Sequence, residues 1–216
     1  MKTLIQSDFD GTLTQEDVSY QILDAFTGSD WRQLLNEYQE GKRPVLSFTR
    51  EAFAMVKEDG ETLIKFVESN ARIRDGVYEL VDYCSRNGFH FVIVSNGLDF
   101  YIKLILERLG LEKIPVFAAK TRLSLSGMGI SYLGPDGREL DDGFKAAYTS
   151  SFLKEGYRVI YIGDGLSDIQ PARLAHHVFA RGVLLEFFKE ANLSCESCVN
   201  LRDVVKGLEF WRHNQP

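Results

Sequence analysis

Residues 3–12 read TLIQSDFDGT, and this stretch decides the predicted fold. Its apolar residues predict a short β-strand over Thr3–Phe9, and the acidic, glycine-containing sequence Asp10-Gly11-Thr12 predicts a turn directly after the strand. The carboxylates of Asp8 and Asp10 therefore stand where a strand ends. In α/β proteins such a strand end is a common place for ligand binding and chemistry.

Two more apolar strands are predicted, over 89–94 and 157–162. The first ends in the polar sequence Ser95-Asn96-Gly97, and the second ends in Gly163–Asp168, which reads GDGLSD. Strands that alternate with predicted helices indicate a parallel sheet, and the carboxyl ends of parallel strands meet at one edge. We therefore expect an α/β protein with a Rossmann-like parallel core and three polar clusters gathered at one edge of its sheet.

The segment from Asp17 to about Asn70 has a different pattern. Its apolar residues recur at helical spacing, interrupted by glycine and proline, which predicts a run of short helices without a strand. Glycines and a Pro-Asp-Gly sequence between 124 and 140 predict a small antiparallel β-ribbon. We expect residues 1–13 and 76–216 to form the catalytic core, and residues 14–75 to form a helical cap inserted into it. The other predicted elements are helices over 77–87, 98–109, 144–154 and 169–175 and short strands over 115–118 and 178–180.

The composition excludes several classes of protein. A chain of 216 residues can bury roughly 70% of its unfolded surface, which suits one core with a large insertion. Hydrophobic residues make up 44% and charged residues 26%, as in globular rather than disordered or fibrous proteins. The net charge of −6 and the pI near 5.3 argue against a nucleic-acid partner. No apolar stretch approaches the roughly 18 residues of a membrane span, so no membrane partner is expected.

Cysteine usage indicates a reducing compartment. The three cysteines, Cys84, Cys195 and Cys198, leave one without a partner and offer no disulfide framework. Cys195 and Cys198 have CxxC spacing, but zinc needs four ligands and redox pairs stand at the start of a helix in another context. We expect no function for that pair. The N-terminus lacks the pattern of a signal peptide, so we expect a cytoplasmic protein.

The polar clusters contain the groups that phosphate and metal chemistry needs. Asp8, Asp10 and Asp164, with Asp168 nearby, offer the hard oxygen ligands that Mg²⁺ prefers. The Ser95 hydroxyl and the backbone N–H groups of its turn, at the start of a helix, are suited to a phosphate group.

A balancing cation is expected close to these carboxylates. Lys145 lies nineteen residues before Asp164 in a predicted helix and is the best candidate. Lys120 and Lys154 fit less well, because one precedes the ribbon and the other ends the helix. Lys145 is therefore the lysine that we expect in the site.

Taken in order, DFDGT, SNG, Lys145 and GDGLSD resemble the four motifs of the haloacid dehalogenase superfamily, and the resemblance covers nearly the whole chain. It implies that fold, with a helical cap in the position between the first two motifs. It also implies that Asp8 is a nucleophile that forms an aspartyl-phosphate and that Asp10 is the general acid and base. An aspartate at position 10 favours a phosphatase or phosphomutase over the ATPases and dehalogenases of the superfamily.

The same resemblance implies a set of binding residues. The residues for Mg²⁺ would be Asp8, Asp164 and Asp10, the last through its backbone carbonyl, with Asp168 in support. Those for the phosphate oxygens would be Ser95, Asn96 and Lys145.

The size of the cap resembles that of the phosphoserine-phosphatase-like branch. Two stretches, 71–76 (ARIRDG) and 95–100 (SNGLDF), are more similar to the methionine-salvage phosphatases that act on 2-hydroxy-3-keto-5-methylthiopentenyl-1-phosphate. The chain departs from both types. Phosphoserine phosphatases usually have Glu where Asp17 stands and a cap Arg near Ala52-Phe53, whereas the methionine-salvage enzymes usually have Gly where Asn96 stands.

We therefore expect a Mg²⁺-dependent phosphomonoesterase acting on a small phosphoester. Aromatic and apolar cap residues such as Phe48, Phe53 and Met55 favour an uncharged or weakly charged substrate. Asp17 and Arg50 are the candidate cap residues for contacting it. Three alternatives stay open: a phosphoserine phosphatase, a phosphotransferase or phosphomutase using the same nucleophile, and a binding protein without catalysis. The sequence gives no oligomeric state.

Overall fold

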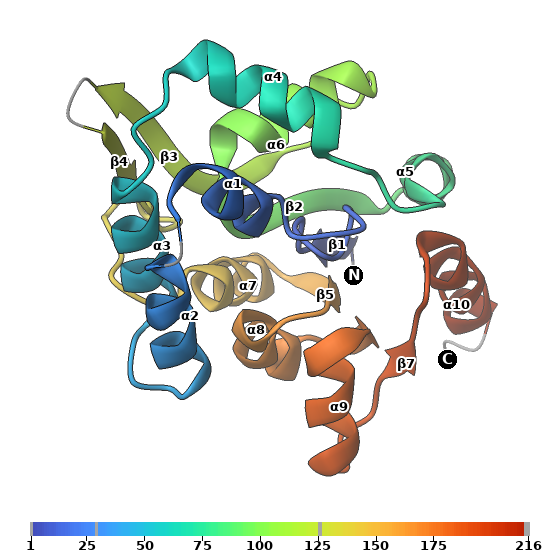
Figure 1. The fold of residues 1–216 in the computed structure, drawn as a ribbon. Helices are drawn as coiled ribbons and strands as arrows, with labels where there is room; N and C mark the ends of the chain where they lie inside the picture. Colours follow the sequence, from blue (N-terminus) through green and yellow to red (C-terminus); the bar gives the residue numbers. More distant parts are fainter. Residues whose placement is uncertain (1, 29, 125–126, 214–216) are drawn as a thin grey trace.

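The computed structural model describes residues 2–28, 30–124 and 127–213. Its centre is a seven-stranded sheet in the order β4-β3-β2-β1-β5-β6-β7 (Figure 1). The strands are β1 (Lys2–Ser7), β2 (His90–Leu98), β3 (Val116–Ser124), β4 (Gly127–Ser131), β5 (Tyr157–Gly163), β6 (His177–Ala180) and β7 (Glu196–Ser197).

The N-terminal strand lies in the middle of this sheet. β1 pairs in parallel with β2 on one side and with β5 on the other. Its residues Leu4 and Ile5 are buried, and so are the polar residues Gln6 and Ser7. A parallel strand covered on both faces is expected to be nearly continuously buried. Among the strand pairs of the described residues, only β3–β4 is antiparallel, so the predicted α/β class with a mostly parallel sheet is confirmed.

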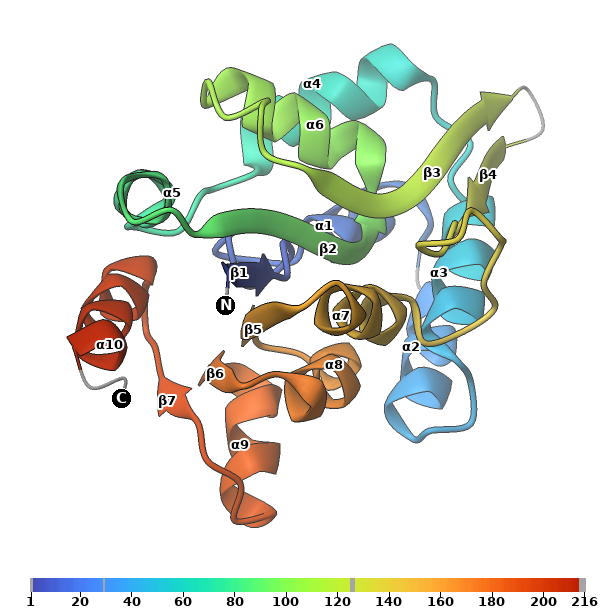
Figure 2. The ribbon, with the colours of Figure 1, turned by 180° about the vertical axis from the view of Figure 1, so that it is seen from behind.

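Helices cover both faces of the sheet. α5, α6 and α10 lie on one face, and α7 and α8 pack together on the other (Figures 1 and 2). The helices of this core are α5 (Val77–Arg86), α6 (Asp99–Arg108), α7 (Phe144–Lys154), the short 3₁₀ helix η1 (Leu166–Asp168), α8 (Ile169–Leu174), α9 (Gly182–Glu190) and α10 (Leu201–His213).

The segment between β1 and α5 is helical, as the sequence predicts. Asp17 and Asp59 begin two of its helices by accepting hydrogen bonds from backbone N–H groups of the first turn. A bridge between Thr14 and Ile73 joins the two ends of the segment. The division into a core and a cap over residues 14–75 stays a prediction. The four helices are α1 (Val18–Phe26), α2 (Trp31–Gln39), α3 (Val45–Ala54) and α4 (Gly60–Asn70).

Some predicted boundaries are wrong. β1 ends at Ser7 and not at Phe9. β2 does not end at Val94 but continues to Leu98, with an irregular register between these residues. The ribbon also begins earlier than predicted, because the strand expected over 115–118 continues to Ser124 and pairs with β4. The glycines after the ribbon form a turn closed by the isolated Leu133–Glu139 bridge, since turn residues can close a loop without extending a strand.

The C-terminal elements α9, β7 and α10 have no counterpart among the predicted elements. α10 packs against α5 and so closes the sheet face on that side (Figure 2). Cys195 and Cys198 flank β7, and both are free thiols, as is Cys84. No helix in the described part of the chain combines the length and apolar character needed to cross a membrane.

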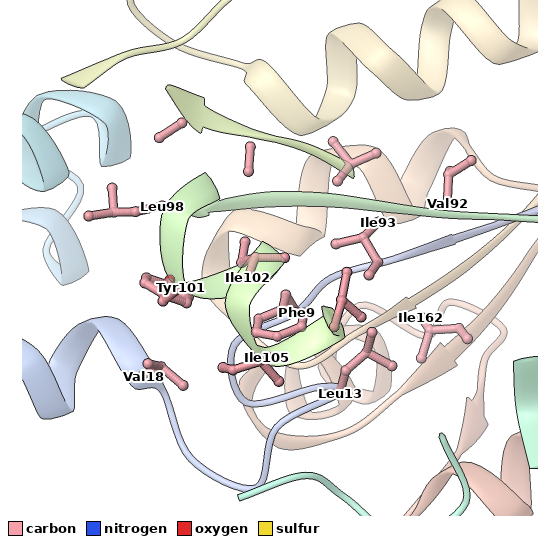
Figure 3. Close-up of a cluster of buried hydrophobic side chains, with 14 of the residues drawn as sticks. Phe9, Leu13, Val18, Val92, Ile93, Leu98, Tyr101, Ile102, Ile105 and Ile162 are labelled. Atoms are coloured by element: carbon pink, nitrogen blue, oxygen red, sulfur yellow. The ribbon is translucent and has the colours of Figure 1, made fainter. Parts of the chain in front are cut away.

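The main hydrophobic core continues from the sheet into the helices that follow β1. Figure 3 shows Phe9, Leu13 and Val18 from the N-terminal segment packed near Tyr101 and Ile105 of α6. This packing fixes the start of α1 and the start of α6 relative to the end of β1. The polar clusters after the strands are therefore held on a rigid base.

Candidate active site

Asp8 is the residue that follows the central strand. Its backbone N–H donates to the Ile162 carbonyl across the sheet at 2.9 Å, which places it beside the end of β5. One carboxylate oxygen accepts a hydrogen bond from the Phe9 N–H at 2.7 Å, and the other lies 2.8 Å from Lys145 Nζ. The Asp8 carboxylate is thus held in one orientation, and it lines a cavity of about 430 Å³ between the sheet edge and the helices that follow β1.

Three carboxylates meet at this edge of the sheet. Oxygens of Asp8, Asp164 and Asp168 all lie within 4.8 Å of one another. Asp164 follows β5, and one of its oxygens accepts a hydrogen bond from the Thr12 hydroxyl at 2.5 Å. Such a set of clustered carboxylate oxygens suits a hard divalent cation.

Asp168 is the most completely hydrogen-bonded member of this cluster. One oxygen accepts from Lys145 Nζ at 2.7 Å and from the Tyr161 hydroxyl at 2.6 Å. The other accepts from the N–H groups of Asp164 and Gly165, each at 2.9 Å. Burial alone would raise the pKa of Asp168, but Lys145 and these hydrogen bonds outweigh burial and lower it. Asp168 therefore stays charged and anchors Lys145.

A side chain of the central strand holds the backbone of α7 at Lys145. The side-chain amide of Gln6 donates to the Lys145 carbonyl at 3.2 Å and accepts from the Thr149 hydroxyl at 2.8 Å. Burial lowers the pKa of the Lys145 ammonium, but Asp168 and Asp8 reverse the effect, so the pKa is raised and the group stays charged. Of the three lysines considered, Lys145 is the one that the fold brings to Asp8.

The charged forms of Asp8 and Asp164, the other two acids of the cluster, are destabilised by their surroundings. Burial raises the pKa of Asp8, and repulsion from Asp168 raises it further against the attraction of Lys145. Burial and Asp168 likewise raise the pKa of Asp164 to about 6. Crowded carboxylates with raised pKa values are typical of sites that bind a cation or carry out catalysis.

Asp10 points away from the three clustered carboxylates. Its Oδ1 accepts from the Val18 N–H at 3.0 Å, and its Oδ2 accepts a short hydrogen bond from the Tyr101 hydroxyl. Burial and the nearby Asp17 raise the pKa of Asp10. A carboxyl group with a raised pKa at the wall of a cavity has the property that a general acid requires.

The last part of β2, Ser95–Gly97, forms another part of the cavity lining. The Ser95 hydroxyl accepts from the Gly97 N–H at 3.0 Å, and the Asn96 carbonyl accepts from the Tyr132 hydroxyl at 2.5 Å. The Asn96 side-chain oxygen is buried without a hydrogen-bond partner among the described residues. The structure thus brings Ser95 and Asn96 to the same cavity as Asp8, as the motif order predicts.

Two arginines that the sequence did not single out hold the loop after β1. Arg181 donates to the carbonyl of Gly11. The Arg74 guanidinium donates to four carbonyls of the same loop, those of Gly11, Thr12, Thr14 and Gln15. These contacts fix the loop that carries Asp10. Arg74 lies in the 71–76 stretch quoted above for its resemblance, but that stretch did not predict a contact with this loop.

The cavity enclosed by these groups has a volume of about 430 Å³. One side of the cavity is formed by residues of the predicted cap segment 14–75 and is called the cap wall. It combines aromatic or apolar residues with a few polar ones: Gln15, Glu16, Asp17, Ser19, Tyr20, Tyr38, Gln39, Val45, Phe48, Thr49 and Phe53. Among the described residues of this wall there is no lysine or arginine. Asp17 lines it as expected, and burial raises the pKa of its carboxyl to about 7.

Arg50 is not among the described residues that line this cavity. Its guanidinium instead forms ion pairs with Glu139 at 3.1 Å and Asp141 at 3.2 Å and donates to the Leu140 carbonyl at 2.8 Å. It also lies over the Tyr132 ring. The structure therefore joins Arg50 to the loop after the ribbon and not to the substrate cavity.

A family model described as haloacid dehalogenase-like hydrolase matches residues 5–173. The chain belongs to this family. The matched segment runs from the central strand through α8 and contains all four motifs. The predicted family and the prediction of a hydrolytic enzyme are therefore confirmed.

Curated relatives of this family member are named 2-hydroxy-3-keto-5-methylthiopentenyl-1-phosphate phosphatase. The protein from Brevibacillus brevis is 26% identical over 213 residues, which is 96% of each chain. The protein from Geobacillus thermodenitrificans is 28% identical over 207 residues, covering 94% of this chain and 93% of the relative. The predicted similarity to the methionine-salvage type is thus confirmed over almost the full length.

Solved structures with the same fold include phosphoserine phosphatases. A phospho-aspartyl intermediate analogue of phosphoserine phosphatase has a TM-score of 0.70 with 23% identity, covering 95% of this chain and 98% of the other. A phosphoserine phosphohydrolase-like protein from Francisella tularensis has a TM-score of 0.66 with 24% identity, covering 95% and 99%. At this level of identity the likeness shows the fold alone, and it confirms the predicted haloacid dehalogenase architecture.

Proposed function

We propose that this protein is a Mg²⁺-dependent phosphomonoesterase that hydrolyses a small-metabolite phosphate ester through an aspartyl-phosphate at Asp8. The observation that carries the proposal is the position of the Asp8 carboxylate. It lines the cavity at the end of the central strand, with the Lys145 ammonium 2.8 Å from one of its oxygens. Membership of a hydrolase family and relatives named as phosphatases support the same reaction class.

In the first step an Asp8 oxygen attacks phosphorus, a new P–O bond forms, and the P–O bond to the alcohol breaks. Asp10 gives its proton to the leaving oxygen. In the second step a water molecule transfers a proton to Asp10 and attacks phosphorus, the bond to Asp8 breaks, and inorganic phosphate is released. Ser95, Asn96 and Lys145 would hold the phosphate oxygens, since all three line the cavity beside Asp8.

The carboxylate cluster fits a divalent cation. Asp8 and Asp164 would hold Mg²⁺ with their side chains, and Asp10 would add its backbone oxygen. Asp168 would support the site from behind, because its four hydrogen bonds occupy both of its oxygens. When bound, Mg²⁺ would spread the negative charge of the transferring phosphoryl group.

The cap side of the cavity supports an uncharged or weakly charged leaving group. Tyr38 and Phe48 stack with ring centroids 5.7 Å apart, and Tyr20 packs against Phe48 edge-on. The leaving group of the phosphoester named for the relatives carries hydroxyl, keto and methylthio groups and no charge. That methionine-salvage enol phosphate is therefore the first substrate to test.

Phosphoserine is the less favoured alternative. Its carboxylate needs a cation, and no lysine or arginine occurs among the described cap residues of the cavity. The exposed Glu16 and the half-buried Asp17 lie there instead, and they would attract the phosphoserine ammonium group but repel its carboxylate. A strong preference for phosphoserine over uncharged esters would contradict the proposed substrate class.

The test is phosphate release from a panel that contains the methionine-salvage enol phosphate, phosphoserine and simple sugar and alcohol phosphates. Each is assayed with Mg²⁺ and with EDTA, using the wild type and Asp8→Asn. Asp82→Asn is the matched control, because Asp82 is an exposed residue of α5 that forms an ion pair with Arg86. We expect release that requires Mg²⁺ and is lost in Asp8→Asn but kept in Asp82→Asn.

Two other results would contradict the proposal. Unchanged release by Asp8→Asn would remove Asp8 from the reaction. Loss of substrate without release of phosphate, together with phosphorylation of a second alcohol, would instead identify a phosphotransferase or phosphomutase that excludes water from the site.

A further inference from the structure

Tyr101 is a buried residue that the reaction described above does not use. It stands in the first turn of α6, a few residues after the Ser95–Gly97 segment of β2, and its side chain is fully buried. Its hydroxyl lies 2.8 Å from the Ser19 hydroxyl of α1 and donates a short hydrogen bond to Asp10 Oδ2. The hydroxyl therefore joins α6, α1 and the loop after the central strand at one point.

We propose that Tyr101 is a positioning residue for the general acid and base, and that its hydroxyl holds the Asp10 carboxyl group in place at the cavity wall. This inference rests on the proposed function, in which Asp10 protonates the leaving alcohol. Tyr101 itself is not among the described residues lining the cavity. It acts through Asp10 and does not contact the substrate.

The Asp10 carboxyl group is clamped at both oxygens. The Val18 N–H donates to Oδ1 at 3.0 Å, and the Tyr101 hydroxyl donates to Oδ2. A carboxyl group held by one hydrogen bond can still rotate, whereas bonds to two different oxygens fix its plane. Each oxygen keeps a second acceptor position, so the clamped group can still exchange a proton with the substrate. Removing the Tyr101 hydroxyl leaves one half of the clamp.

The position of the Tyr101 hydroxyl is itself fixed. Its ring packs against Phe9 and Phe100, with centroids 6.3 and 5.5 Å apart. Figure 3 shows the ring among the buried side chains of Phe9, Val18 and Leu98. The Ser19 hydroxyl holds the other side of the phenol oxygen. A rigid donor of this kind costs little entropy when Asp10 binds to it.

Gly97 provides the space for this pair. A Cβ atom at position 97 would overlap both the Tyr101 hydroxyl and Asp10 Oδ2. The Ser95–Gly97 segment of β2, which also supplies proposed phosphate ligands, therefore packs directly on the clamped carboxyl group. A residue with a side chain at this position would push Asp10 and Tyr101 apart.

The leaving group of the substrate separates a positioning role from a structural one. An alkyl phosphate needs a proton on its leaving oxygen, whereas p-nitrophenolate leaves readily without one. Loss of the clamp on the general acid should therefore slow the first kind of ester selectively. The test compares kcat/KM for p-nitrophenyl phosphate with kcat/KM for the alkyl phosphate that the wild type hydrolyses fastest, in Tyr101→Phe and in the wild type. This ratio reports the step that forms the aspartyl-phosphate and excludes the second step, which is common to both esters.

We expect Tyr101→Phe to lower kcat/KM for the alkyl phosphate by roughly 10-fold or more and kcat/KM for p-nitrophenyl phosphate by less than about 3-fold. An equal loss on both esters, or no loss on either, would overturn the assignment. No phosphate release by the wild type from any ester would overturn the proposed function first and this assignment with it. The two failures are thus distinguishable.

Two further variants separate the role from a general effect on folding. Tyr148→Phe is the matched control, because Tyr148 is also largely buried and donates its hydroxyl to a backbone carbonyl, that of Leu133, at 3.0 Å. It should leave the ratio of the two rates unchanged. In an Asp10→Asn background, Tyr101→Phe should cause no further selective loss on the alkyl ester. A second loss of the same size would contradict action through Asp10.

Discussion

The sheet edge and the cap wall face the same cavity, but they are built in different ways. On the sheet edge the charged groups of Asp8, Lys145 and Asp168 are each held by two or more ion pairs or hydrogen bonds. On the cap wall, aromatic rings such as Tyr38 and Phe48 are held mainly by packing against one another. Directional contacts define the positions of reacting atoms, whereas packing defines only a shape.

This difference suggests a division of tasks. The sheet edge would decide which bond is broken, and the cap wall would decide which alcohol fits beside it. Polar contacts between the two regions include the Tyr38 hydroxyl, which interacts with Ser167 beside Lys145, and Arg50, which joins α3 to the loop after the ribbon. Substitutions on the two sides should therefore have effects of different kinds.

The largest expected effect is on the sheet edge, at Asp168. Asp168→Asn should lower the free energy of unfolding by about 3 kcal/mol, because a buried partner of Lys145 is lost and the new amide group must face existing donors. Urea unfolding in EDTA at pH 7 measures this change. A loss of less than about 1 kcal/mol would contradict the anchoring role of Asp168.

Asp164→Asn is the matched substitution in the same cluster. The pKa of Asp164 is raised to about 6, because burial and repulsion from Asp168 outweigh the attraction of Lys145 and Arg181. Its charge therefore opposes folding on balance above the pKa of the unfolded chain, and removing that charge at pH 7 costs no net electrostatic stabilisation. We expect the free energy of unfolding in EDTA to change by less than about 1 kcal/mol, while Mg²⁺-dependent phosphate release is lost. A loss of stability as large as that of Asp168→Asn would remove the distinction between the two acids.

A smaller effect is expected where the cap meets the core. Arg50→Met removes the ion pairs to Glu139 and Asp141 and the contact with Tyr132. Because partly exposed ion pairs contribute little, stability should change by less than about 1 kcal/mol. We expect KM to rise by roughly 3-fold or more, since the cap is held less firmly over the cavity.

Arg32→Met is the control for this substitution. Arg32 also combines an ion pair, to Asp24, with a position over an aromatic ring, that of Trp31, but both partners belong to the same helical segment. It should lower stability by a similar small amount and leave KM unchanged. Equal increases in KM for the two variants would show that Arg50 has no special role at the junction of cap and core.

The smallest expected effect concerns the charge of the cap wall. Gln39 is an exposed residue that lines the cavity. The described residues of the cap wall include no lysine or arginine. Gln39→Arg should raise kcat/KM for phosphoserine relative to an uncharged ester by roughly 3-fold, since a partly screened charge pair is worth about 1 kcal/mol or less. Gln39→Glu should shift the ratio the other way. Shifts in the same direction would show that charge at this rim does not select the substrate.

Much of the fold and the proposed reacting groups could be predicted because they follow from local patterns. Apolar runs that end in polar clusters identified the strands, and parallel pairing brings such clusters together. The geometry agrees: Asp8, Asp164 and Lys145 lie at one edge of the sheet. Family membership is shown by the matched model, while the catalytic roles of these residues stay predictions.

The supporting contacts could not be predicted in the same way. Gln6 and Lys145 are 139 residues apart, and a glutamine within an apolar strand carries no local signal of its partner. The same holds for Tyr101, whose place in an amphipathic helix is equally consistent with ordinary core packing. Arg50 shows the reverse case. Its charge on the cap suggested a substrate contact, but only the folded chain shows that the loop at Glu139 lies closer.

The most direct test of the central claim is the mass of the peptide that carries Asp8 after the Asp10→Asn variant is mixed with p-nitrophenyl phosphate and quenched with acid. This ester needs no general acid for the first step, whereas the second step needs the base that the variant lacks. We predict a burst of p-nitrophenol equal to the enzyme concentration and a phosphoryl group on Asp8. An unmodified Asp8 in an enzyme that has released p-nitrophenol, or a phosphoryl group on another residue, would contradict the assignment of Asp8 as the nucleophile.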